Sequence, residues 1–255
     1  DGGGGTQGRG RGGEPIRAAR GARRERAPDR SAWTMTRTAL PGRNLDLLRT
    51  VAVLAVLSNH IANALIGHVT LLAGWLGQAG VQAFFVHTSL VLMGSMEKDG
   101  APDSRGWVKR FYIRLVWRIY PLAIVVIAVV LLLHVPSVNF RGPLEHFSLG
   151  DIAANFALVQ DLFHRRQILG VLWTLPLELQ MYVALPLCFL IARKPSVGGM
   201  IALLAAGVVA AVTFTLGQAS IPGVWRLRVL GVVPFVLEGV LAYWLLRRVQ
   251  QARLP

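Results

Sequence analysis

Long apolar blocks are the feature of this sequence that most restricts its fold. Six mostly apolar segments approach or exceed the ~20 residues that a helix needs to cross a bilayer, and they lie at 45–66, 71–96, 111–134, 171–192, 199–217 and 229–246. Only 16% of the 255 residues are charged, whereas 53% are hydrophobic. A chain in lipid must satisfy its backbone hydrogen bonds internally, which favours helices. We therefore predict an all-α, polytopic transmembrane helical bundle, with its membrane domain at 44–248.

The segment 151–163 leaves the number of spans open. It is apolar but short, and it contains Asn155, Gln160 and Asp161. It is either a seventh span or a helix at the membrane interface, and its length favours six spans. The arginine-rich N-terminal segment and the basic segment 98–118 flank the first two spans. The positive-inside rule therefore predicts a cytoplasmic N-terminus.

The net charge of +14 is concentrated at the start of the chain. Ten arginines and four acidic residues precede Asn44, a net charge of +6. Residues 1–34 are rich in glycine and arginine and lack apolar periodicity, so we predict a disordered leader. Met35 is a natural translation start, so the leader is either an upstream, non-native extension or an arginine-rich tail that contacts anionic lipid. Most of the remaining charge lies between apolar blocks, which predicts contact with membrane lipids and no binding of nucleic acid.

The first apolar block carries Arg49 and His60, which lie eleven residues apart. Eleven residues make about three helical turns, so both side chains project from one helix face, about 16 Å apart along the axis. Charges in hydrocarbon cost about 2.5 to 3.5 kcal/mol on insertion scales and usually have a function. Alternatively, Arg49 extends to the interface and His60 is a packing residue.

Arg110, Arg114 and Arg118 recur every four residues at the start of the third block and form a stripe on one helix face. The planar guanidinium donates two parallel hydrogen bonds to phosphate. The stripe therefore suits a cofactor with several phosphates, such as coenzyme A. It is equally compatible with a simple positive-inside anchor.

Glu178 lies inside the fourth apolar block, with Tyr182 one turn later. A carboxylate in lipid is functional by default. With six spans Glu178 lies at about the depth of His60 and could pair with it, whereas seven spans would put the two in opposite halves of the membrane. Glu238 is interpreted as a second buried acid, paired with an arginine.

Two further patterns carry less weight. The spacing His146-x4-Asp151 occurs in glycerolipid acyltransferases, but no phosphate-binding block follows it here. The sequence shows no cluster of metal ligands, so we predict no metal site.

Five motifs in order resemble the acyltransferase-3 family, bacterial membrane enzymes that O-acylate polysaccharides, peptidoglycan and some small molecules. They are "LDLLRTVAVLAVLSNH", "GVQAFFVHTSLVLM", "RFYIRLVWRIYPL", "LWTLPLELQMYVALPL" and "PFVLEGVLAY". The second motif departs from the family pattern, because Gln82 replaces an acid and Thr88-Ser89 replace Ser-Gly. Family members have about ten spans, so we expect this chain to be truncated at its C-terminus.

The resemblance implies an acyl-CoA donor, usually acetyl-CoA, and an acceptor hydroxyl on a carbohydrate or lipid-linked saccharide. It implies catalytic roles for His60 as base or acyl carrier, for Glu178 in orienting it, and for Arg49 in guiding the donor. Arg110, Arg114 and Arg118 would hold the CoA phosphates. The alternatives are an acyltransferase that acts on a small molecule and a transporter or flippase that uses the buried Arg, His and Glu.

Overall fold

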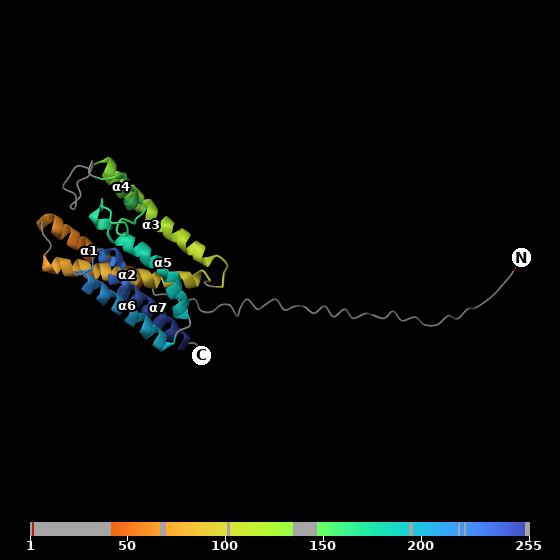
Figure 1. Cartoon of the computed structure of the whole chain (residues 1–255). Helices are drawn as coiled ribbons and strands as arrows, with labels where there is room; N and C mark the ends of the chain where they lie inside the picture. The colour runs from red at the N-terminus through yellow and green to blue at the C-terminus, as the bar shows by residue number, and fades with distance from the viewer. Residues whose placement is uncertain are drawn as a thin grey trace. The chain divides into compact units, whose positions relative to one another are not determined.

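The computed structural model describes Gly2 and residues 42–66, 70–100, 103–134, 147–193, 196–218, 220–221 and 223–252 (Figure 1). The chain divides into two units, Asp1–Arg37 and Thr38–Pro255, and the helices belong to the second. The predicted disorder of residues 1–34 falls, apart from Gly2, outside the described residues, and so does His146.

The described part of the chain is helical and contains no strand, which confirms the all-α bundle. Six of its helices are long and apolar enough to cross a membrane. The helices are α1 (Gly42–Ile66), α2 (Leu71–Lys98), α3 (Trp107–Leu132), α4 (Leu149–Phe156), α5 (Thr174–Arg193), α6 (Val197–Gly217) and α7 (Val233–Ala252). Short 3-10 turns, η3 (Gly170–Leu172) and η4 (Val224–Gly231), precede α5 and α7. With only eight residues, α4 is too short to cross a membrane, so the described residues agree with the six-span alternative.

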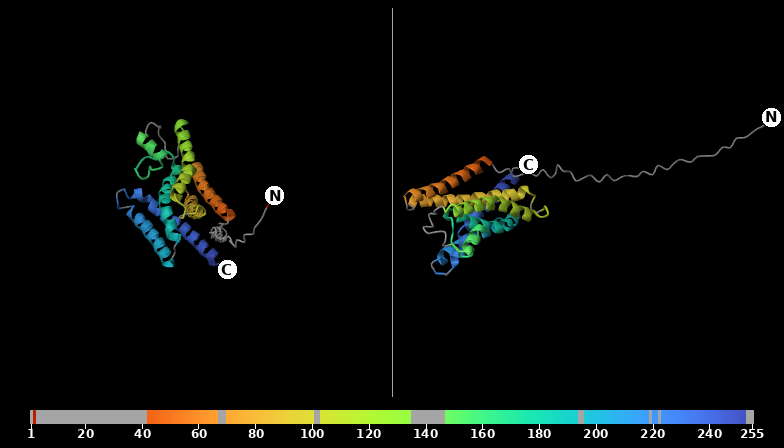
Figure 2. Two further views of the ribbon diagram at one scale, coloured as in Figure 1. Left: turned by 90° about the vertical axis from the view of Figure 1, so that its right-hand side faces the viewer. Right: turned by 90° about the horizontal axis from the view of Figure 1, so that it is seen from above.

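Helix α2 lies between α1 and α7 and packs against both (Figures 1 and 2). Glycines allow these close approaches, as is common between helices in lipid. A Cβ atom added to Gly80 of α2 would lie 2.7 Å from the Ala52 carbonyl oxygen of α1. A Cβ atom added to Gly239 of α7 would overlap Ser89 Oγ and the Val86 carbonyl oxygen of α2. Small residues therefore set the spacing on both sides of α2.

Helix α3 buries one stripe and exposes the rest of its surface. Its buried residues recur every four positions and include Phe111, Leu115, Ile119, Ala123 and Ile127. This spacing covers one face of a helix. The opposite face is apolar and exposed, as expected for contact with lipid hydrocarbon. Helix α1 is the least buried of the six spans, and its main packing partner is α2.

Residues 147–169 form a compact polar cap rather than a span. Ser148 and Asp151 make a capping box at the start of α4, and Asp151 also accepts a 3.2 Å hydrogen bond from the Arg166 backbone N–H. The amide nitrogen of Asn155 donates to the Asp151 and Arg166 carbonyls at 2.8 and 2.7 Å. Its amide oxygen accepts from the Ile168 N–H at 3.0 Å. The polar residues of this segment therefore tie a short helix to the chain that leads into α5.

Candidate active site in the bundle

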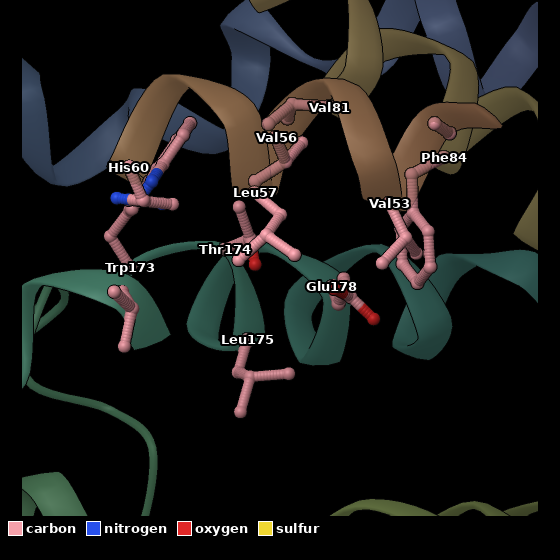
Figure 3. A pocket seen from close by; sticks show the side chains of 12 residues that line it. Val53, Val56, Leu57, His60, Val81, Phe84, Trp173, Thr174, Leu175 and Glu178 are labelled. Atoms are coloured by element: carbon pink, nitrogen blue, oxygen red, sulfur yellow. The ribbon is translucent and has the colours of Figure 1, made fainter. Parts of the chain in front are cut away.

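A cavity of about 430 Å³ lies between α1, α2 and the start of α5. His60 enters it from α1 and Glu178 from α5 (Figure 3). Most of its other lining side chains are apolar, which limits the water that can compete for polar contacts inside it. The lining residues are Ala52, Val53, Val56, Leu57, His60, Val81, Phe84, Val171, Trp173, Thr174, Leu175 and Glu178.

The structure brings His60 and Glu178 to one cavity but does not pair them. Glu178 is buried, with 5% of its surface exposed, and it accepts a 2.9 Å hydrogen bond from the Tyr182 hydroxyl one turn further along α5. In Figure 3 its carboxylate points away from the His60 ring, which lies nearer Trp173. A direct bond between the two side chains therefore requires Glu178 to rotate away from Tyr182.

Arg118 interacts with groups on other helices rather than with the loop that the stripe adjoins. Its positive charge acts on Glu178 and Tyr182 of α5 and on His87 of α2. These groups come from segments that are 30 to 90 residues apart in the sequence. Arg118 is itself exposed, so its influence on these groups is electrostatic.

Arg110 and Arg114 instead bind the loop between α2 and α3. Arg110 donates to the Arg105 carbonyl at 2.9 Å and to Ser104 Oγ at 2.6 Å. Arg114 forms a two-point ion pair with Asp99, and 49% of its side chain is exposed. A phosphate ligand would have to share or replace these partners.

Arg49 lies opposite His87, a residue that the sequence analysis did not single out. Gly80 of α2 packs against Val56 of α1. Because the two helices are antiparallel, seven residues further along α2 and seven residues back along α1 lead to His87 and Arg49. The charge of Arg49 acts on His87, which is 5% exposed and whose Nδ1 atom has no hydrogen-bond partner. The signal was present in the sequence, since His87 is the only titratable residue between 71 and 96.

The structure also shows where Glu238 and Asp151 lie. Glu238 was expected to be buried, and it is exposed. The reason is that α7 turns Val236, Val240 and Tyr243 toward its neighbours, which leaves Glu238 on another face. Asp151 uses its carboxylate oxygens in the α4 cap, at 2.8 to 3.2 Å from their donors. Its role is therefore structural, as the missing phosphate-binding block suggested.

Comparison with known proteins identifies the family to which this chain belongs. The model of the acyltransferase-3 family, described as an acyltransferase domain, matches residues 43–255. No match was found among curated proteins or among solved structures. The matched region includes all six candidate spans and the two residues, His60 and Glu178, that line the cavity from different helices. The chain therefore belongs to the acyltransferase-3 family and is a multi-pass membrane acyltransferase.

Proposed function

We propose that this protein transfers an acyl group, usually acetyl, from acyl-CoA to a hydroxyl of a cell-surface or lipid-linked carbohydrate in a bacterial plasma membrane. The observation that carries the proposal is the shared, partly open cavity, which a histidine and a carboxylate from different helices both line. A general base beside a space for two substrates is what acyl transfer to a hydroxyl requires.

His60 is the proposed base. It takes the proton of the acceptor hydroxyl while that oxygen attacks the thioester carbon. The new carbon–oxygen bond forms, the carbon–sulfur bond breaks, and the CoA thiolate leaves and is protonated to the thiol. In a second version the imidazole nitrogen attacks the thioester carbon, the carbon–sulfur bond breaks, and CoA leaves as the thiol with the ring proton. The acyl-imidazole then passes the acyl group to the acceptor oxygen, and the acceptor's proton returns to the ring.

Glu178 and Tyr182 are proposed to act as a unit. Tyr182 holds the carboxylate at 2.9 Å, and rotation of Glu178 toward the cavity would bring it to the imidazolium that forms during the reaction. A negative charge there stabilises the protonated ring, as the carboxylate of a hydrolase triad does.

The arginines are proposed to handle the donor. Arg110 and Arg114 lie at the end of α3 that the positive-inside rule assigns to the cytoplasm, where acyl-CoA is found. Arg118 and Arg49 both act on His87 through their charges, and we propose that they guide the part of the donor that enters the bundle. Their positive charges would stabilise negative charge that develops on the thioester oxygen.

The test is transfer of label from acetyl-CoA in membranes that contain the protein. We expect the parent to label a saccharide hydroxyl and the His60→Ala variant, at equal protein level, to lose about 100-fold or more of this activity, as loss of a general base implies. His134→Ala is the matched control, because His134 is exposed and lies at the end of α3.

Three other outcomes would contradict parts of the proposal. Equal labelling by parent and His60→Ala would remove His60 from the chemistry. Transfer only to small alcohols or amines would replace the carbohydrate acceptor by a small molecule. No transfer from any acyl-CoA, together with proton or solute movement across vesicles, would favour a transporter.

A further inference from the structure

Trp173 lines the cavity, Arg228 stacks on its ring, and Asp161 lies within range of the Arg228 charge; we call these three residues the tryptophan rim. Trp173 lines the cavity and lies at its His60 end (Figure 3). The guanidinium carbon of Arg228 stands 4.5 Å from the centre of the Trp173 ring system. The charge of Arg228 also acts on Asp161. Three segments that are distant in the sequence therefore converge beside the proposed base.

The backbone at the rim is irregular although it belongs to the candidate spans. Trp173 follows the 3-10 turn η3, and Arg228 lies in η4, where Leu227 has φ −92° and ψ 22°. These turns begin the candidate spans Gly170–Arg193 and Arg226–Ala252. Non-helical backbone at membrane depth is tolerated where it is buried in protein or lines a water-filled cavity. Trp173 therefore stands at the start of its span, between an irregular turn and the cavity that it lines.

Asp161 is held in place by a strained loop. Leu158 is 1% exposed and has φ 57°, and His164 has φ 58°. Such conformations persist in non-glycine residues only where surrounding contacts enforce them, and the Asn155 hydrogen bonds supply such contacts. Burial raises the pKa of Asp161, while the charge of Arg228 opposes this shift. Asp161 Oδ2 is buried and has no hydrogen-bond partner.

We propose that the tryptophan rim binds the acceptor, and that the acceptor presents a pyranose ring to Trp173. A pyranose has a flat face of C–H groups and an edge of hydroxyls. The indole ring offers an apolar surface to the C–H face of the sugar, while the guanidinium of Arg228 has five N–H donors for the hydroxyls at its edge. The Arg228 guanidinium covers one face of the indole, so the pyranose would pack on the other face. This inference rests on the proposed acyl transfer and names the part of the site that selects the acceptor.

The test is saturation-transfer NMR with the protein in nanodiscs and a fixed set of methyl pyranosides as probes. We expect saturation of pyranoside ring protons in the parent and about a tenfold weaker affinity in Trp173→Leu, the loss of one stacked contact. Arg228→Lys keeps the charge but not the flat stack, and we expect it to weaken binding as well. Trp117→Leu is the control, because Trp117 is 74% exposed on α3. Binding of acetyl-CoA, measured by calorimetry, verifies that each variant is folded.

The outcomes separate this inference from the proposed function. Equal saturation in the parent and in a Trp173→Leu variant that binds acetyl-CoA would overturn the rim. No saturation by any pyranoside, with acyl transfer to other hydroxyl compounds, would also overturn it but leave the acyl transfer standing. Saturation that depends on Trp173 and Arg228, without acyl transfer to any acceptor, would support the rim and refute the proposed reaction. If Trp173→Leu does not fold, Arg228→Lys and Arg228→Gln decide by the same measurement.

Discussion

Replacing Asp151 by Asn should open the α4 cap locally without removing catalysis. The Asp151 carboxylate accepts hydrogen bonds from Ser148 N at 3.0 Å, Ser148 Oγ at 2.8 Å and Arg166 N at 3.2 Å. An Asn side chain keeps one acceptor oxygen but turns an NH2 group toward the remaining donors. Hydrogen bonds to charged groups contribute about 1.5 to 3 kcal/mol. We therefore expect the free energy of opening this cap to fall by about 2 to 3 kcal/mol.

Hydrogen exchange read by mass spectrometry measures this change directly. At about 1.4 kcal/mol per factor of ten, the amides of residues 151–168 should exchange roughly 30- to 150-fold faster in Asp151→Asn. Amides of α2 and α7 should be unaffected and serve as the internal control. Unchanged exchange in the cap would refute the structural role. A loss of acyl transfer by several orders of magnitude with unchanged exchange would instead restore His146 and Asp151 as a catalytic pair.

The same experiment has a defined pH dependence. Burial alone would raise the pKa of Asp151, but hydrogen bonds from Ser148 and Arg166 outweigh it and leave the pKa below its ordinary value of 3.8. The ionised form therefore stabilises the cap. This contribution is fully present above the unfolded pKa and is lost as the pH falls through the lower, folded value. Exchange in the parent should accelerate only in that acid range, and the Asn variant should lack this step.

Three further predictions concern the packing, the cavity and the donor. Gly239→Ala should lower the free energy of unfolding in detergent by about 1 to 3 kcal/mol, because the new Cβ meets Ser89 and overpacking is costly. The control is Gly198→Ala, whose Cβ meets nothing within 4 Å and which should leave the free energy of unfolding unchanged. Equal effects of the two substitutions would contradict the close α2–α7 contact. Tyr182→Phe should slow acyl transfer and destabilise the protein by about 1.5 to 3 kcal/mol through loss of the bond to the buried Glu178, and unchanged thermal unfolding would argue against this bond. Asp99→Asn should lower the KM for acyl-CoA, because it releases the Arg114 guanidinium. The free energy of unfolding should fall by at most about 1 kcal/mol, because the pair is surface-exposed. A raised KM would show instead that Asp99 positions Arg114 for the donor.

The spans could be predicted from the sequence because hydropathy and length are sufficient for that purpose. The second block was predicted at 71–96 and the helix runs from Leu71 to Lys98. The third helix begins at Trp107, four residues before its predicted start, because Lys109 and Arg110 lower the hydropathy but do not end a helix. It begins after Gly106, whose φ of 76° marks the turn.

The direction in which each polar side chain points could not be predicted. Hydropathy does not distinguish the faces of a helix that is apolar all round. Glu238 was therefore assigned to the interior although it is exposed, and His87 was overlooked although it is buried. The arginine stripe was recognised, but its partners Asp99 and Ser104 come from a loop whose path the periodicity does not determine.

The carboxylate beside the cavity is tolerable in lipid because its own helix and a second helix both supply groups that compensate it. A lone carboxylate in hydrocarbon is expensive, yet Glu178 has the Tyr182 hydroxyl at 2.9 Å and the charge of Arg118, which comes from a helix 60 residues earlier in the chain. If the Tyr182 bond offsets part of the cost of the carboxylate and Arg118 offsets the rest, neither helix could hold its charged residue alone. Assembly of α3 with α5 and formation of the site are then one event. The residues that make the cavity reactive would thus also select the helix packing that creates it.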